Sequence, residues 1–293
     1  MIYFTELLIN GALTGLMYSL VALGIVLIYK SSGVPNLAQG AMVMIAAYMV
    51  WLFSQVMGIP VIIALVLAVL GMFVLGLATE RFLLRRMVGQ PIIMVVMLTL
   101  GLESLLRGVG PGTLGAAPKN IDLHLSMMPI IAGGVFINRE YLIGGIVAGL
   151  MVFGALLFFR TRIGTKLRAV SDDHVASWSV GISVERAVAI SWGLAGVSAV
   201  AAGAMWGSIQ GVDWTLTALL FPAVAVVILG GLDSVPGVFV GGLIVGILGS
   251  VIPGYVDPIV GGGTRDVVTS LVILLTIMFR PHGIFGREDI ERI

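Results

Sequence analysis

The sequence has little charge and no cysteine, and both absences narrow the possible classes of protein. Charged residues make up 11% of the 293 residues, against about 25% in soluble domains. Apolar residues make up 59%. So few charges do not cover the surface of a soluble globule, and a disordered chain has low hydrophobicity instead. The lack of cysteine excludes disulfide bonds and thiol catalysis.

Common signatures of enzymes are also missing. The sequence contains no GxxxxGK(S/T) phosphate-binding loop, so it does not bind ATP in that way. It has no HExxH metal motif and no serine in a GxSxG context. The formal net charge of +1 gives no reason to expect a nucleic-acid partner. We therefore expect a protein that is not an enzyme and that holds no metal or cofactor of its own.

What the sequence does contain is a series of long runs without Asp, Glu, Lys or Arg. They cover residues 7–29, 31–79, 141–159, 187–212, 214–232 and 234–256. A helix needs about 20 apolar residues to cross a bilayer. The sequence therefore predicts an all-α polytopic membrane protein with about eight to ten transmembrane helices, in a single domain that covers residues 1–293. The expected spans are 7–29, 37–57, 59–79, 91–107, 140–159, 187–207, 216–232, 237–254 and a short last one at 266–280.

The distribution of basic residues predicts which loops are cytoplasmic. Such loops carry an excess of Lys and Arg. Arg107, Lys119, Arg139 and Arg265 fall in one set of loops, and the other twelve of the 16 basic residues fall in the opposite set. That opposite set is predicted to be cytoplasmic, which places the N-terminus outside and the C-terminus inside. The twelve are Lys30, Arg81, Arg85, Arg86, Arg160, Arg162, Lys166, Arg168, Arg186, Arg280, Arg287 and Arg292.

Two predicted loops are long enough to have functions of their own. The outer loop 108–139 is rich in Gly and Pro and is expected to cover the outer mouth. The cytoplasmic loop 160–186 is the most charged part of the chain, and its stretch 165–180 is predicted to form one or two short helices. Glycines spaced four apart, such as Gly11 with Gly15, predict close helix packing. A subunit interface at 237–246 is the alternative for one such group.

Ionisable residues are rare inside the expected spans. Glu103 and Arg107 are spaced i,i+4 on one helix, so we expect a local ion pair. No series of Asp, Glu or His runs through the other spans. This absence disfavours a proton- or sodium-driven carrier that acts alone, because such carriers keep ionisable residues in their spans.

The segment 31–40 is polar but uncharged, and it separates two apolar runs. One interpretation is a cytoplasmic turn, for which Gly33 and Pro35 are typical residues. The other is a broken helix whose backbone groups and amide side chains line a polar path. Polar residues spaced four apart on the first helix either face a water-filled cavity or bond to neighbouring helices. The candidate path residues are Asn10, Thr14, Tyr18, Asn36, Gln39 and Gly40.

The charged loop carries a pattern that resembles a known family. Residues 164–182 follow G-x-x-x-R-A-x-x-x-D, then A, then G-I. This resembles the ATPase-contacting loop of permeases of the branched-chain amino acid ABC importer family. Three other segments are similar to motifs of that family, and all four occur in its order along nearly the whole chain. They are 35–40 (N-x-A-Q-G), 230–237 (G-G-x-x-S-x-P-G) and 280–286 (R-P-x-G-apolar-F-G, with His282 where Gln is common).

The resemblance implies a permease chain without an ATPase of its own, in the inner membrane of a bacterial-type cell. The implied partners are a second permease chain (homologous or identical), two ABC ATPase subunits, an extracytoplasmic substrate-binding protein and membrane lipid. ATP and Mg would bind in the ATPase subunits. The implied residues of ATPase coupling are Gly164, Arg168, Ala169, Asp172, Asp173, Trp178 and Gly181.

The implied substrates are branched-chain amino acids, which are zwitterions with apolar side chains. A path for them needs apolar walls and uncharged donors and acceptors, and the candidate path residues are of that kind. Urea and short amides suit the same walls, so the composition leaves the substrate open. A self-sufficient channel or secondary carrier for small neutral solutes is the alternative function.

Overall fold

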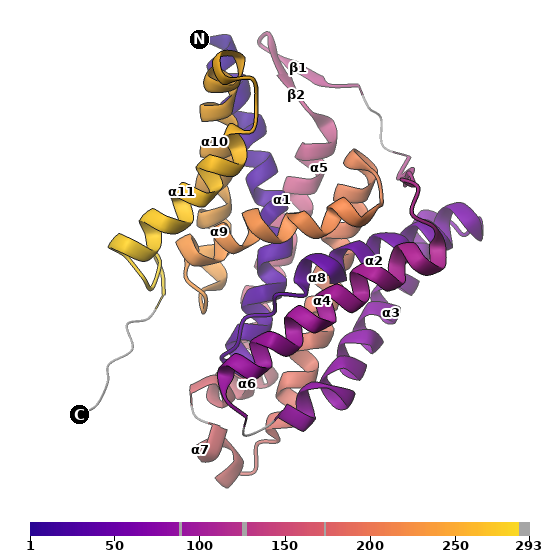
Figure 1. The fold of residues 1–293 in the computed structure, drawn as a ribbon, viewed down its shortest axis with the longest axis vertical. Coiled ribbons are helices and arrows are strands. Elements are labelled where there is room, and N and C mark those ends of the chain that lie inside the picture. The colour runs from indigo at the N-terminus through magenta and orange to yellow at the C-terminus, as the bar shows by residue number, and fades with distance from the viewer. Residues whose placement is uncertain (88–89, 125–127, 173, 287–293) are drawn as a thin grey trace.

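The computed structural model describes residues 1–87, 90–124, 128–172 and 174–286. Within these ranges, eleven α-helices form one bundle and a single β-hairpin lies at one end (Figure 1). Seven segments are long and apolar enough to cross a membrane. The elements are α1 (Ile2–Ser32), α2 (Gln39–Trp51), the π-helical turn η1 (Leu52–Val56), α3 (Val61–Phe82), the 3-10 turn η2 (Leu84–Met87), α4 (Ile92–Leu114), β1 (Ile130–Ala132), β2 (Val135–Ile137), α5 (Arg139–Arg160), α6 (Arg162–Asp172), α7 (His174–Ser179), α8 (Val184–Gln210), the 3-10 turn η3 (Trp214–Leu219), α9 (Leu220–Gly230), α10 (Val235–Val260) and α11 (Thr264–Phe279).

The predicted fold class, an all-α polytopic membrane protein, is confirmed. Seven of the nine expected spans correspond to the long helices, with α2 and η1 together forming one. The other two are short: α9 has 11 residues after the six of η3, and α11 has 16. At 1.5 Å per residue, α11 is about 24 Å long, less than the roughly 30 Å of a bilayer core. The last predicted span is therefore present as a helix and is short, as expected.

The bundle has two ends, which we name the hairpin end and the α6 end (Figure 1). At the hairpin end, the hydroxyl of Tyr3 donates to the carbonyl of Gly254 at 3.0 Å, so the start of α1 lies beside the last turns of α10. At the α6 end, Nζ of Lys30 donates to the carbonyl of Asp233 at 2.6 Å, which joins the end of α1 to the turn before α10. The N-terminus and the last described residues thus lie at opposite ends, and which end is cytoplasmic stays a prediction.

Helix α1 is at the centre of the bundle because glycines let α10 approach it closely. A Cβ atom on Gly15 would lie 2.0 Å from the carbonyl oxygen of Gly242, and Gly246 packs on the same turn of α1. The hydroxyl of Ser19 donates to the carbonyl of Val238 at 2.9 Å, which adds an interhelical hydrogen bond. The predicted small-residue packing is confirmed for Gly11 and Gly15 but not for Gly149, which has nothing within 4 Å of its Cβ position. Residues 237–246 use their glycines against α1 and α9 of the same chain rather than for a second subunit.

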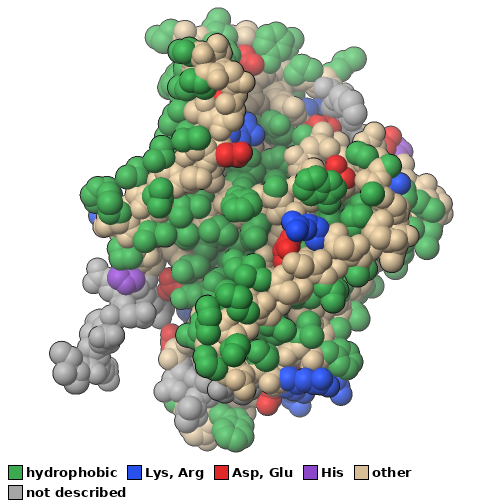
Figure 2. Space-filling model, in the orientation of Figure 1, with side chains coloured by type: hydrophobic (Ala, Val, Ile, Leu, Met, Phe, Trp, Pro, Cys, Tyr) green, Lys and Arg blue, Asp and Glu red, His purple; other side chains and the backbone are tan. Residues whose placement is uncertain are grey.

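The outer helices present large apolar side chains outward and small ones inward. On α3, the small residues Ala64, Ala68 and Gly76 are buried together with Met72, while Ile62, Ile63, Val66, Leu70 and Val74 are exposed. Figure 2 shows apolar side chains spread across the whole visible face. This arrangement suits a lipid surround, in which close backbone approach rather than burial of large side chains holds helices together.

Two predicted boundaries differ from the structure. The outer loop was expected from residue 108, but α4 continues through Pro111 to Leu114, because Gly110 packs against Met44 and Tyr48 of α2. Arg265 was expected in an outer loop, but it lies in the first turn of α11. In both places tertiary packing overrides the turn propensity of Gly and Pro.

Candidate functional site

Residues 33–38 re-enter the bundle instead of turning at its surface. Helix α1 ends at Gly33, whose φ of 68° stops the helix, and α2 begins at Gln39. The side chain of Gln39 lies against Gly24, so closely that a Cβ atom on Gly24 would be 2.0 Å from Nε2. Gly24 lies eight residues before Ser32, about 12 Å inside the α6 end. This geometry matches the broken-helix interpretation.

Two fully buried amides satisfy the polar groups of this turn. Asn36 accepts the backbone N–H of Ala38 on Oδ1 at 3.0 Å and donates from Nδ2 to Oε1 of Gln39 at 3.3 Å. Gln39 donates from Nε2 to the carbonyl of Ala195 on α8 at 3.3 Å. Irregular backbone is tolerated at membrane depth only where the protein meets its polar groups. These contacts therefore offset part of the cost of breaking the helix at this depth.

Gly40 brings a second irregular segment to the same place. A Cβ atom on Gly40 would lie 2.4 Å from the carbonyl oxygen of Thr217, so η3 packs directly on the first turn of α2. The backbone N–H of Leu37 donates to Oγ1 of Thr99 on α4 at 3.4 Å. We call Asn36, Gln39, Gly40, Thr99 and Thr217 the central polar cluster. It offers uncharged donors and acceptors and is closed in this structure, because all five residues are buried.

The polar stripe of α1 lies apart from this cluster, nearer the hairpin end. Asn10 donates from Nδ2 to the carbonyl of Phe136 in β2 at 2.8 Å and accepts the N–H of Asn138 at 3.0 Å. It thereby ties α1 to the hairpin and to the N-cap of α5. A cavity of about 380 Å³ borders the same residues, together with Glu6 and Tyr141. Asn10 thus both bonds to a neighbouring element and borders a cavity, so both interpretations of the stripe stay open.

The other two stripe residues are buried. The hydroxyl of Thr14 donates to the carbonyl of Asn10 in its own helix at 2.8 Å. Tyr18 stacks on Trp206 of α8, with ring centroids 5.1 Å apart and planes 14° apart. A role of Asn10, Thr14 and Tyr18 in a translocation path stays a prediction.

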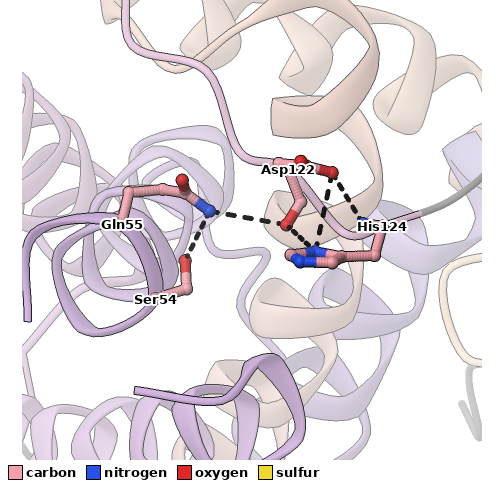
Figure 3. Close-up of polar contacts among 4 residues, drawn as sticks. All are labelled: Ser54, Gln55, Asp122 and His124. Atoms are coloured by element: carbon pink, nitrogen blue, oxygen red, sulfur yellow. Dashed lines mark hydrogen bonds and ion pairs between the residues drawn. The ribbon is translucent and has the colours of Figure 1, made fainter. Parts of the chain in front are cut away.

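The outer loop is bonded to η1, the turn that follows α2 (Figure 3). Gln55 donates to the carbonyl of Asp122 at 3.4 Å, and the carboxylate of Asp122 accepts the N–H of His124 at 2.7 Å. Lys119 and Val212 exchange two backbone hydrogen bonds of 3.0 and 2.7 Å. The loop thus crosses the ends of α2 and α8 and fixes the entry to η3.

At the other end, α6 is an amphipathic helix that lies on the bundle. Leu167 and Val170 are buried against it, whereas Lys166 and Arg168 are exposed. A Cβ atom on Gly164 would lie 2.3 Å from the carbonyl oxygen of Phe158, so only glycine allows α6 to fold back on the end of α5. The prediction of one or two short helices in this loop is confirmed.

The remaining coupling candidates surround α6 and α7. Trp178 is 75% exposed at the tip of the α6 end, an unusual place for a tryptophan unless a partner covers it. Gly181 adopts φ 81° in the turn to α8. Asp172 is exposed and Ala169 is half-buried. Asp173 lies outside the described residues, as do Arg287 and Arg292.

Motifs that are distant in the sequence meet at the α6 end. The N–H groups of Ile284 and Phe285 donate to the carbonyls of Leu229 and Gly230 at 2.8 and 3.1 Å, so the last described turn caps α9. A cavity of about 300 Å³ there is bordered by Arg168 of α6, by the turn before α10 and by Phe285. Three of the four family-like motifs therefore share one surface, which sequence order alone does not reveal.

The chain is similar to known proteins over its whole length. Residues 7–279 match the family described as branched-chain amino acid transport system / permease component. The high-affinity branched-chain amino acid transport system permease protein BraD of Pseudomonas aeruginosa is 27% identical, over 99% of this chain and 98% of its own. LivH of Escherichia coli K12, of the same description, is 25% identical over 100% and 98%. A probable branched-chain amino acid transport permease protein LivH of Methanocaldococcus jannaschii is 29% identical over 91% and 88%.

A solved structure has the same fold. PsaBC from Streptococcus pneumoniae in complex with Fab aligns with a TM-score of 0.52 over 96% of this chain and 93% of that chain. The sequence identity is 17%, so this likeness speaks for the fold alone.

Proposed function

Because the chain belongs to the family of permease components of branched-chain amino acid transport systems, we propose that it forms part of the membrane pathway of an importer for branched-chain amino acids or related small polar solutes. It is a transport subunit and not an enzyme, and the hydrolysis of ATP belongs to partner ATPase subunits. The observation that carries the proposal is the family match over residues 7–279 of a multi-pass helical bundle. A self-sufficient channel or secondary carrier is not favoured.

The complete transporter comprises this chain, a second permease chain, two ATPase subunits and an external substrate-binding protein. The α6 end is the cytoplasmic one and receives the ATPases, with ATP and Mg bound there. The exposed charges of Arg168 and Asp172 and the exposed ring of Trp178 support this assignment, because charged groups orient an interface and buried aromatic anchors stabilise it. Gly164 and Gly181 hold the segment in place by allowing the turns before and after it.

The central polar cluster and the stripe on α1 belong to the translocation path. Both offer uncharged donors and acceptors to a solute, and both lie in the part of the bundle that the long helices enclose. The cluster is closed in this structure, so transport requires that η3 and the start of α2 separate during the cycle. ATP hydrolysis in the partner subunits drives that opening through α6.

Reconstitution of the complex in liposomes tests the function. We expect uptake of radiolabelled leucine only when ATP, both permease chains, the ATPases and the binding protein are present, and we expect leucine to compete better than urea or acetamide. The control is the same liposome with a non-hydrolysable ATP analogue. Uptake by this chain alone, independent of ATP, would overturn the proposal.

A further inference from the structure

Arg265 extends to the middle of the membrane depth. Its Nε atom donates to the carbonyl oxygen of Gly249 at 3.1 Å. Gly249 lies eleven residues before Val260 in α10, which is about 16 Å from the hairpin end of that helix. Tyr18, which lies halfway along the 31-residue α1, is close enough to Arg265 for the two side chains to interact electrostatically.

The side chain of Arg265 lies on the inner face of α11, not on the face that lipid covers. Residues three, four, seven and eleven positions later lie on the same side of the helix, and all four are buried: Val268, Thr269, Val272 and Thr276. The opposite side carries exposed apolar residues at helical spacing: Val267, Leu271, Leu274 and Met278. Arg265 is nevertheless exposed. Its side chain therefore lies against α10 at mid-depth and stays accessible.

A positive charge in the membrane interior carries a large cost in free energy, so such a residue usually has a function. Arg107, the exposed cation on α4, is explained by an ion pair, because it lies 3.6 Å from Glu103 of the same helix, as predicted. For Arg265, no carboxylate of the described residues lies within 4.0 Å. A guanidinium has five N–H donors, and the carbonyl of Gly249 engages the one on Nε. The remaining fork suits an incoming carboxylate, which a guanidinium binds with two parallel hydrogen bonds.

We propose that Arg265, assisted by the hydroxyl of Tyr18, binds the carboxylate of an amino acid as it passes the middle of the membrane. This inference rests on the proposed function and deepens it, because it selects among the solutes that the sequence leaves open. Amino acids carry a carboxylate, whereas urea and short amides do not. The path then contains one fixed positive charge, in contrast to the expectation of uncharged groups only.

Arg265→Gln tests the assignment in the reconstituted complex with its own partners. We expect the initial rate of leucine uptake to fall about tenfold or more, because a charge-assisted hydrogen bond to the substrate is lost. Assembly on size-exclusion chromatography and ATP hydrolysis stimulated by the liganded binding protein are retained. Arg265→Lys keeps the charge but not the planar fork, so it retains part of the uptake. Tyr18→Phe lowers uptake less than Arg265→Gln does.

The double variant Glu103→Gln with Arg107→Gln is the matched control, because it removes the paired charges of α4 without change in net charge. We expect its leucine uptake to stay within about twofold of wild type. Three results overturn the inference: uptake unchanged by Arg265→Gln, loss of complex assembly (which would make Arg265 a subunit contact), or a wild-type complex that transports urea but no amino acid. Absence of any ATP-driven uptake by wild type sinks the proposed function itself, whereas unchanged uptake in Arg265→Gln sinks only the carboxylate site.

Discussion

The turn at residues 33–40 and the segment at residues 162–182 both interrupt the apolar helices, and they place their polar groups in opposite ways. In the turn, Asn36 and Gln39 are fully buried and bond to each other and to α8. In the segment, Arg168 and Trp178 are exposed at the α6 end. Polar residues in this chain thus either bond to each other inside the bundle or are exposed where a partner can bind them, and burial distinguishes these two cases. Substitutions in the turn should therefore change stability, and those in the segment should change coupling.

Gly40→Val should have the largest effect on stability. The added side chain would meet the carbonyl oxygen of Thr217, which is a backbone atom and cannot rotate away as the end of a flexible side chain can. We expect a loss of about 3 kcal/mol or more, seen as a large drop in the thermal unfolding temperature of the detergent-purified chain. Gly149→Ala is the control, because nothing lies within 4 Å of its Cβ position and α5 gains a better helix former. Wild-type unfolding of Gly40→Val would show that η3 does not pack on α2.

Gln39→Leu should destabilise the chain less. It leaves the Nδ2 atom of Asn36 and the carbonyl of Ala195 without this partner, at a cost of about 1–3 kcal/mol. In a double-mutant cycle, the combination with Asn36→Leu should cost less than the sum of the two single substitutions, because both remove the same hydrogen bond. Thermal unfolding of the four proteins measures the difference. Additive costs would mean that the two amides act independently and that the cluster is not one unit.

The class of protein and the long helices are predictable from the sequence because the bilayer imposes them. Charge-free windows, the ion pair of Glu103 with Arg107 and the helical propensity of residues 165–180 all depend on nearby residues. The polar break at residues 31–40 is visible for the same reason. The sequence offers the broken helix as one of two interpretations but does not choose between them, because the choice depends on contact of Gln39 with Ala195, 156 residues away.

The position of Arg265 is a second feature that the sequence does not predict, because it too depends on contacts between distant segments. A charge after Gly261, Gly262 and Gly263 suggests an outer loop, because polar residues and glycines usually end a span. The structure instead folds α11 back along α10, so that the side chain reaches Gly249. The only sequence signal was the adjacent pair Arg265 and Asp266 at the start of a short apolar run. The central polar cluster was likewise incomplete, because Thr99 and Thr217 look like ordinary hydroxyl residues within spans.

Charge reversal in the coupling segment should have the smallest effect on stability. Arg168 and Asp172 are exposed, and surface substitutions usually change stability by no more than about 0.5 kcal/mol. We therefore expect Arg168→Glu and Asp172→Arg to leave insertion in the membrane and thermal unfolding unchanged, while ATP hydrolysis in the complex no longer drives leucine uptake. Proteoliposomes give both rates in one preparation.

The control for this last comparison is Arg86→Glu, which makes the same charge change at an exposed position of η2, outside α6. If the surface potential of the α6 end alone governs docking of the ATPase, the two arginine reversals will weaken transport equally. If α6 is the coupling element, Arg168→Glu will abolish it and Arg86→Glu will not. Full transport by Arg168→Glu would assign its exposed charge to solvent or lipid headgroups. The distinction between a buried polar turn and an exposed charged segment that binds a partner would then no longer hold.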